Sequence, residues 1–264
     1  RITNGINQGF NKKGIKKDEL WSPITKRKFA SKANEFGRWM VEEEIWEKNP
    51  FKSLPQDFTV RGNTRAETFT AEQVDELFTV ASREENRRMI PYLALIFFSG
   101  ARPEEIADEK GERFEWRKMH KWKNKSKVTG GILFEILARE DGLNRSKGAR
   151  DRYADLAPSG VKWIKWYQKE VKGTDELPNE GKVDFSRKVF DRIKREANCS
   201  PWPNDVARHT FTSLAQRYDK FDQSNANYWL DKCGHKRETY EKNYNAPKTP
   251  EECEDYFNIT PPEP

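Results

Sequence analysis

The sequence is poor in the residues that build disulfides and metal sites. It holds three cysteines and three histidines in 264 residues, and no two cysteines lie close together. An odd number of widely spaced cysteines does not form a disulfide framework, and these histidines are not at metal-ligand spacing. We therefore expect a protein of a reducing cytoplasm, with no disulfide, no zinc finger and no metal site.

Long apolar runs are missing as well. No stretch approaches the roughly 18 apolar residues that a membrane-spanning helix needs, so we expect no membrane partner. The first residues, Arg1-Ile2-Thr3, are neither an initiator methionine nor a signal peptide, and we expect an N-terminally truncated chain. Hydrophobic residues are 34% of the chain and charged residues 35%, which indicates modest cores under a heavily charged surface.

The chain carries 49 basic and 43 acidic residues, an excess of basic charge that gives a net charge of +6 and a pI of about 9.0. This suits a polyanionic partner such as nucleic acid, although a mild lysine excess also occurs in ordinary soluble proteins. Residues 1–56 hold 12 basic and 7 acidic residues. Within them, Ser22-Pro23 predicts a helix start, and the pattern ends near Asn49-Pro50. The apolar residues of this helix recur at helical spacing: Phe29, Ala33, Phe36 and Met40.

The remaining patterns predict a second, larger domain. Residues 57–68 lack helical periodicity and are interpreted as a linker, and residues 69–264 form the second domain. Thr70 to Gln73 is a capping box, and residues 89–99 are a nearly all-apolar helix that stops at Gly100. Two short apolar segments, 132–137 and 152–156, predict paired strands. Helical patterns follow over residues 161–171, 185–197, 206–218 and 226–233. The expected fold class is mainly α with a small antiparallel β-sheet (α+β).

Four short segments of this second domain contain residues suited to phosphate chemistry. In chain order they are Ser99-Gly100-Ala101-Arg102-Pro103-Glu104-Glu105-Ile106, Ser146-Lys147-Gly148-Ala149-Arg150-Asp151-Arg152, Asp205-Val206-Ala207-Arg208-His209-Thr210-Phe211, and Cys233-Gly234-His235 with Tyr244 nine residues after the histidine. Arginine forks hold the charge that develops on a phosphodiester and are never deprotonated. A tyrosine hydroxyl is a usable nucleophile if its proton is removed, and a lysine among cationic neighbours can protonate a leaving oxygen.

These segments resemble the motif set of the tyrosine recombinase (phage integrase) family over roughly residues 70–260. The resemblance implies a helical core-binding (SAM-like) DNA-binding domain over residues 1–56 and a catalytic integrase domain. It assigns Tyr244 as the nucleophile that forms a 3′-phosphotyrosine. The other residues that fall on family positions are Arg102, with Glu105 in support, Lys147, Arg208 and His235. Because the bond energy is stored in the phosphotyrosine, this chemistry needs no cofactor and no metal.

The sequence leaves several of these assignments open. The family has a histidine where this chain has Asp205, which could accept the tyrosine proton or orient Arg208 or His209. Lys125 and Lys127 compete with Lys147 as the hairpin lysine, and Tyr240 lies on the same helical face as Tyr244. Taken one at a time, Arg208 could be a charge on a helix surface, and Arg102 could be a surface residue that caps a helix C-terminus.

Further basic residues are candidates for DNA contact. The stretch from Arg113 to Lys127 is rich in basic residues with interleaved aromatics, and it is either a solvated loop or a surface that contacts the DNA backbone. The expected first helix, over residues 25–46, offers a second basic set. The predicted DNA-binding residues are Lys26, Arg27, Lys28, Lys32, Arg38, Arg117, Lys118, Lys121 and Lys123.

The resemblance also implies partners. We expect double-stranded DNA, a homotetramer on paired sites, accessory DNA-bending proteins, and a nucleoid-associated protein of a prokaryote or phage that integrates or excises a mobile element. The tail after Tyr244 either packs on a neighbouring protomer or folds back on its own domain. Two other functions remain open, namely a type IB topoisomerase-like enzyme and a DNA-binding module without catalysis.

Overall fold

The protein is represented by a computed structural model, which divides into two compact units, Arg1–Asn63 and Thr64–Pro264. The residues that it describes are 23–54, 67–107, 114–121, 131–137, 151–218, 233 and 248–263. The boundaries expected at residues 56 and 68 fall on or beside the undescribed segment 55–66, so they stay predictions.

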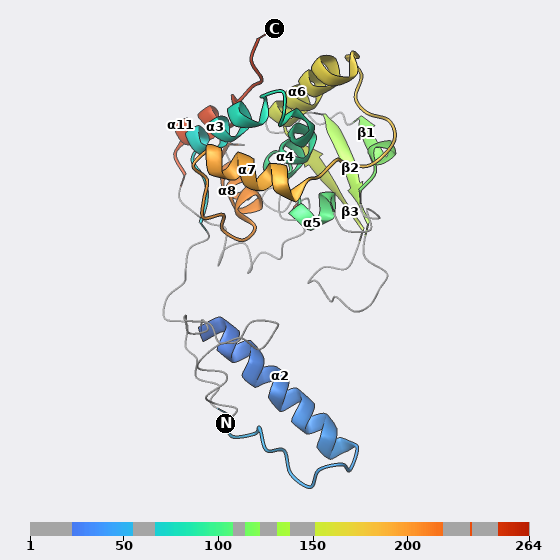
Figure 1. Cartoon of the computed structure of the whole chain (residues 1–264), viewed down its shortest axis with the longest axis vertical. Coiled ribbons are helices and arrows are strands. Elements are labelled where there is room, and N and C mark those ends of the chain that lie inside the picture. The colour runs from blue at the N-terminus through green and yellow to red at the C-terminus, as the bar shows by residue number, and fades with distance from the viewer. Residues whose placement is uncertain are drawn as a thin grey trace. The chain divides into compact units, whose positions relative to one another are not determined.

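The described part of the first unit is one long helix and a returning segment. Helix α2 spans Pro23–Glu42, shown in blue in Figure 1, and it begins at the predicted proline. It does not continue to Trp46 or Asn49 as the sequence pattern predicted. Glu42, Glu43 and Glu44 follow one another at this end, where the negative pole of the helix dipole disfavours carboxylates. Glu44 takes a left-handed φ of 56°, which turns the chain back.

The buried face of α2 differs from the face that the apolar spacing suggested. Phe29 is 52% exposed and Phe36 is 47% exposed. The buried positions are Ala30 and Gly37, and the small size of Gly37 lets residues 49–51 approach the helix closely. A Cβ atom on Gly37 would lie 2.1 Å from Asn49 Oδ1, and the Asn49 amide donates to Asn34 Oδ1 over 2.7 Å. Among the described residues of this unit, the close contact with the helix therefore lies at a glycine.

The second unit is built around one fully buried helix. Helix α3, Ala71–Ala81, begins with the predicted capping box at Thr70, and a 3₁₀ turn, Arg87–Met89, leads into α4, Ile90–Phe97. Every residue of α4 is buried, as its apolar run predicted. It packs against α6 and α8 at the centre of the unit. The short helix α5, Pro103–Ile106, follows it after the turn at Gly100.

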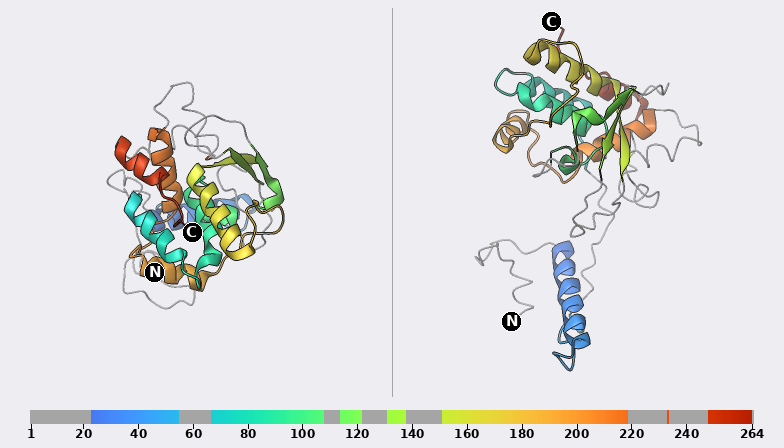
Figure 2. Two further views of the ribbon diagram at one scale, coloured as in Figure 1. Left: turned by 90° about the horizontal axis from the view of Figure 1, so that it is seen from above. Right: turned by 90° about the vertical axis from the view of Figure 1, so that its right-hand side faces the viewer.

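A three-stranded antiparallel sheet lies at one side of the helices of this unit (Figures 1 and 2). Its strands, in the order β1-β2-β3, are Met119–Lys121, Ile132–Ile136 and Arg152–Leu156. The predicted pair is β2 and β3, with Phe134 opposite Ala154. The first strand was not predicted, and with the 3₁₀ turn Trp116–Lys118 it lies inside the basic stretch that the sequence presented as a loop.

Helices complete the unit. They are α6, Pro158–Tyr167, continued by a π-helical turn, Gln168–Lys172, then α7, Arg187–Glu196, α8, Val206–Tyr218, and α11, Pro250–Phe257. Helix α8 has the predicted bounds. The mainly α fold with a small antiparallel sheet is confirmed. No helix in the described residues is long and apolar enough to cross a membrane.

The C-terminal tail packs on its own unit in this structure. Helix α11 contacts α8 and α3. The Tyr256 hydroxyl, which is fully buried, donates a hydrogen bond to the Phe97 carbonyl, and Ser159 Oγ donates to the Phe257 carbonyl over 2.5 Å. Of the two alternatives for the tail, folding back on its own domain is the one that the chain adopts here.

Candidate active site

The turn before Arg102 is held by contacts that only glycine permits. Gly100 has a φ of +68°, and a Cβ atom there would lie 2.8 Å from Cys233 Sγ and 2.9 Å from Phe211 Cδ1. Ser99 Oγ donates to the Leu95 carbonyl, which fixes the end of α4. The conformation and the close approach together fix the direction in which the chain leaves α4. They thereby fix the position of Arg102, the N-cap residue of α5.

Arg102 and Glu105 are joined in two ways at the start of α5. The backbone N–H of Arg102 donates to Glu105 Oε2 over 2.7 Å, and its Nη1 lies 3.2 Å from Glu105 Oε1. The first contact is the reciprocal half of a capping box, which ties the glutamate to the helix N-terminus. Arg102 is therefore the N-cap residue of α5, with a side chain that is 25% exposed, and not a cap at a helix C-terminus.

Two more arginines reach the same carboxylate from other elements. Arg152 Nη2, on β3, lies 2.5 Å from Glu105 Oε2, and Arg208 Nη1, on α8, lies 4.0 Å from the same oxygen. The side chains of Glu105 and Arg152 are 3% and 10% exposed. The arrangement brings together segments that lie up to about a hundred residues apart, and three guanidinium groups meet at one carboxylate.

Arg208 is also anchored to two of the other motifs. Its Nη1 donates to the Gly100 carbonyl over 2.8 Å, and its Nη2 donates to the Cys233 carbonyl. The residue is fully buried, so the alternative of a charge on a helix surface is wrong. A buried guanidinium requires such partners, because an unpaired charge in the interior is very costly. The turn at Gly100, the start of α8 and Cys233 are thus one hydrogen-bonded assembly.

The electrostatics favour an ionised Glu105. Burial acts to raise the pKa of this carboxyl, but the charges of Arg152, Arg208 and Arg102 and the hydrogen bond from the Arg102 backbone together lower the pKa below its ordinary value. Burial also lowers the pKa of Arg152, against the opposing effect of Glu105. Arginine stays protonated under these conditions. The site therefore presents fixed positive charge, which is what a phosphate group requires.

Arg152 is the member of this cluster that sequence reasoning missed. The sequence placed it at the end of the Lys147 segment and as the first residue of a strand, and gave it no role in the site. A signal was present, because alternate residues of a strand share a face and Arg152 shares one with Ala154 and Leu156, which are buried. A charge on the core face of a strand demands a buried partner.

Of the other predicted catalytic residues, the structure describes only Asp205. The Asp205 backbone has a left-handed φ of 54°, and its carbonyl accepts the N–H of His209 over 2.9 Å. In the described part of the chain its carboxylate forms no ion pair with Arg208. Three predicted residues lie outside the described residues: Lys147, His235 and Tyr244. The competing residues also lie outside them: Lys125, Lys127 and Tyr240.

The predicted DNA-contact residues fall on both units. Those of the first unit lie on α2, and Arg27, Lys28, Lys32 and Arg38 are exposed there, while Lys26 is half-buried. Lys32 forms a surface ion pair with Glu35. In the second unit, Arg117 is exposed and paired with Glu115, and Lys121 is an exposed residue of β1. The Lys118 side chain and Lys123 lie outside the described residues.

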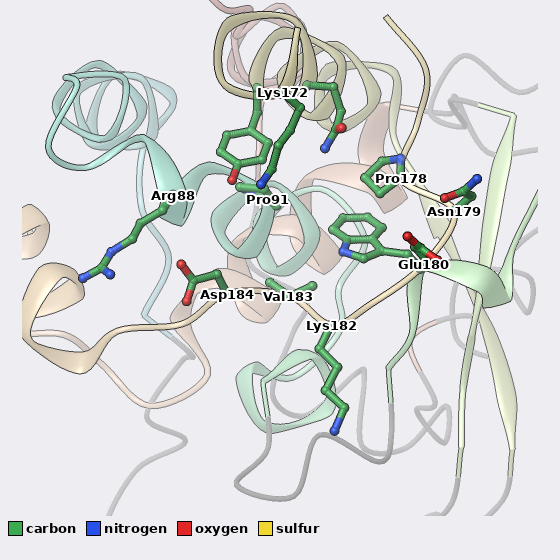
Figure 3. Close-up of a pocket in the computed structure, with 12 residues that line it drawn as sticks. Arg88, Pro91, Lys172, Pro178, Asn179, Glu180, Lys182, Val183 and Asp184 are labelled. Carbon is green, nitrogen blue, oxygen red and sulfur yellow. The ribbon is translucent and has the colours of Figure 1, made fainter. Parts of the chain in front are cut away.

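A pocket elsewhere in the second unit is not part of this site. It lies between the start of α4, the end of α6 and the segment 178–184 (Figure 3). Arg88, Lys172 and Lys182 line it, opposed by Glu180 and Asp184, and no predicted site residue does. Among the described residues, no cluster of His, Cys, Asp and Glu could hold a metal ion.

Comparisons with known proteins give distant likenesses only. No family model and no curated protein matches the chain. The structure is similar to that of XerA recombinase, at 14% identity and a TM-score of 0.46, over 92% of this chain and 84% of that chain. It is also similar to the Tn1549 transposon integrase in complex with transposon right-end DNA, at 12% identity and a TM-score of 0.46, over 92% and 87% of the two chains. At these values neither likeness carries a conclusion about activity.

Proposed function

We propose that the chain is a site-specific tyrosine recombinase that cuts and rejoins DNA strands through a 3′-phosphotyrosine. The observation that carries the proposal is the meeting of Arg102, Arg152 and Arg208 at the Glu105 carboxylate. Two of these arginines and the glutamate are residues that the motif resemblance selects. A buried, fixed array of guanidinium groups is suited to the charge that a phosphodiester develops during substitution.

The proposed reaction begins with attack by Tyr244 on the scissile phosphorus. The Tyr244 oxygen forms a bond to phosphorus, its proton passes to a base, for which Asp205 is the candidate, and the bond from phosphorus to the 5′ oxygen breaks. Arg102, Arg208 and His235 stabilise the pentacoordinate state, and Lys147 protonates the leaving oxygen. A 5′ hydroxyl of the partner duplex then attacks the phosphotyrosine and releases Tyr244. This attack rejoins the strand, and the exchange of both strand pairs passes through a Holliday junction.

The proposal includes the partners that such strand exchange requires. Double-stranded DNA is the substrate, a tetramer on paired sites carries out the exchange, and integration or excision of a mobile element is its use. The net charge of +6 and the exposed basic residues of α2 support DNA as the partner. The chain would then act as a nucleoid-associated protein of a prokaryote or phage, assisted by accessory DNA-bending proteins.

A covalent-adduct assay tests this function. Duplexes that the protein selects from a randomised library are nicked near the bound sequence, so that the cleaved strand cannot be rejoined. Wild type should form a protein–DNA adduct on a denaturing gel, and Tyr244→Phe should form none while still binding. No adduct on duplexes that wild type binds would contradict the proposal and favour a DNA-binding module without catalysis. Adducts accompanied by plasmid relaxation, but by no exchange between two duplexes, would favour a topoisomerase-like enzyme.

A further inference from the structure

Arg152 occupies a distinct place among the three arginines of the site. It projects from the core face of β3, where Ile136 is its cross-strand partner, and its side chain is 10% exposed. Its Nη2 atom lies 2.5 Å from Glu105 Oε2. Arg102 is more exposed, at 25%, and is therefore the better placed of the two to contact a ligand. The side chain of Arg152 is directed at the carboxylate.

The two oxygens of Glu105 have different partners. Oε2 accepts from Arg152 Nη2 and from the Arg102 backbone N–H, whereas Oε1 accepts from Arg102 Nη1. An ion pair at Oε2 fixes the rotation of the carboxylate, and that rotation determines where Oε1 lies. The position of Oε1 in turn fixes the guanidinium of Arg102. Arg152 is thus two contacts removed from the Arg102 fork, yet it constrains the direction of that fork.

We propose that Arg152 is a positioning residue of this site, which acts through Glu105 to hold the Arg102 guanidinium in the orientation that binds the scissile phosphate. The inference rests on the proposed function and adds a residue that the motif resemblance does not assign. Arg152 does not contact the phosphate itself. The ionisation of Glu105 supports this role, because Arg152 is the foremost of the groups that lower the pKa of that buried carboxyl.

The role predicts a loss of rate and not of DNA binding. Displacing a transition-state contact by about 1 Å costs about 100-fold in rate, so Arg152→Gln should slow adduct formation by about that factor. Binding of the whole duplex depends on many contacts and should change less than about threefold. Arg152→Lys keeps the charge but not the planar fork, so its rate of adduct formation should lie between those of wild type and Arg152→Gln.

The experiment measures single-turnover adduct formation on two nicked duplexes, one with an ordinary scissile phosphate and one with a methylphosphonate there. Methylphosphonate lacks the negative charge that the Arg102 fork binds. The loss caused by Arg152→Gln should therefore shrink to within about threefold on methylphosphonate. Arg83→Gln is the matched control, because it breaks a surface ion pair with Glu196 in the same unit and should leave both rates unchanged.

Three results would overturn the inference. Rates of Arg152→Gln within about twofold of wild type would show no role, and equal losses on both duplexes would show a general structural defect. A loss confined to DNA affinity would place Arg152 in binding. If Arg152→Gln fails to unfold cooperatively in urea, the same comparison is made with Arg152→Lys. If wild type forms no adduct at all, the proposed function itself is overturned. If wild type forms adducts and Arg152→Gln forms them at the same rate, only the inference about Arg152 is overturned.

Discussion

Glu105 is the residue on which the described part of the site depends most. It is 3% exposed and is contacted by guanidinium groups from three elements. Replacing it with glutamine leaves buried arginine charge without its counter-charge, and the free energy of unfolding should fall by about 3 kcal/mol at neutral pH. Urea denaturation measures this. Glu196→Gln is the control, because it breaks only the surface pair with Arg83 and should cost less than about 1 kcal/mol.

The same variant gives a pH dependence with a definite sign. The pKa of Glu105 is lower in the folded protein than its ordinary value of 4.5. The ionised carboxyl therefore stabilises the fold above the unfolded pKa, and this contribution is lost as the pH falls through the folded pKa. The difference in unfolding free energy between wild type and Glu105→Gln should be full at neutral pH and shrink below about pH 4.5. A difference that stays constant into the acid range would contradict the assigned ionisation.

At this scale the sequence predicted part of the site. Arg102, Glu105 and Arg208 were candidates because motif order and spacing are local properties of the chain. Arg152 was missed because its partner lies 47 residues away: strand alternation places Arg152 on the core face, but no local pattern identifies Glu105 as its partner. The burial of Arg208 was likewise invisible, since an arginine within a helix is usually on the surface.

At the scale of elements, the turn between α4 and α5 decides where the site begins. Gly100→Ala places a Cβ atom within 3 Å of Cys233 and Phe211 at a φ of +68°. Gly173 is a matched control, because it has the same φ of +68° and open space around it. Both alanine variants should lose about 1 kcal/mol from backbone strain, and Gly100→Ala should lose about 1–3 kcal/mol more from overpacking. Thermal unfolding of the two variants measures the difference, and equal losses would contradict the close packing at Gly100.

The docking of α11 offers a second test at this scale. The Tyr256 hydroxyl is fully buried and donates to the Phe97 carbonyl, whereas Tyr153 is 43% exposed and its hydroxyl lies 3.1 Å from Glu135 Oε1. Tyr256→Phe removes a buried hydrogen bond and should lower the free energy of unfolding by about 1–2 kcal/mol. Tyr153→Phe should change it by less than about 0.5 kcal/mol. A loss at Tyr256 no larger than at Tyr153 would argue against α11 packing on its own unit in solution.

Elements whose signals are local were predicted well. The capping box at Thr70, the apolar run of α4 and the bounds of α8 each depend on neighbours in sequence. The end of α2 was predicted too late, because apolar spacing continues past the glutamates that terminate the helix. Strand β1 was missed because it is three residues long and lies in a basic stretch, so it exists only through pairing with β2.

For the whole molecule, the basic charge predicts salt-dependent binding to DNA. Arg27 and Arg38 are exposed on α2, and their spacing of eleven residues places them on one face of the helix. If both contact phosphates, replacing both with glutamine should reduce the slope of log affinity against log salt by about 2. Lys162→Gln with Lys165→Gln is the control, because it removes equal charge from an exposed face of α6. Equal slopes for the two double variants, measured by fluorescence anisotropy, would show that α2 adds no specific phosphate contacts.

The central claim is that this chain attacks DNA with a tyrosine, and the most direct measurement identifies the atom that carries the DNA. Adducts formed on nicked duplexes are digested with trypsin and nuclease, and the nucleotide-bearing peptide is sequenced by mass spectrometry. The phosphodiester should be found on Tyr244, linked to the 3′ end of the cleaved strand. Linkage through Tyr240, through a serine, or to a 5′ end would contradict the proposed chemistry.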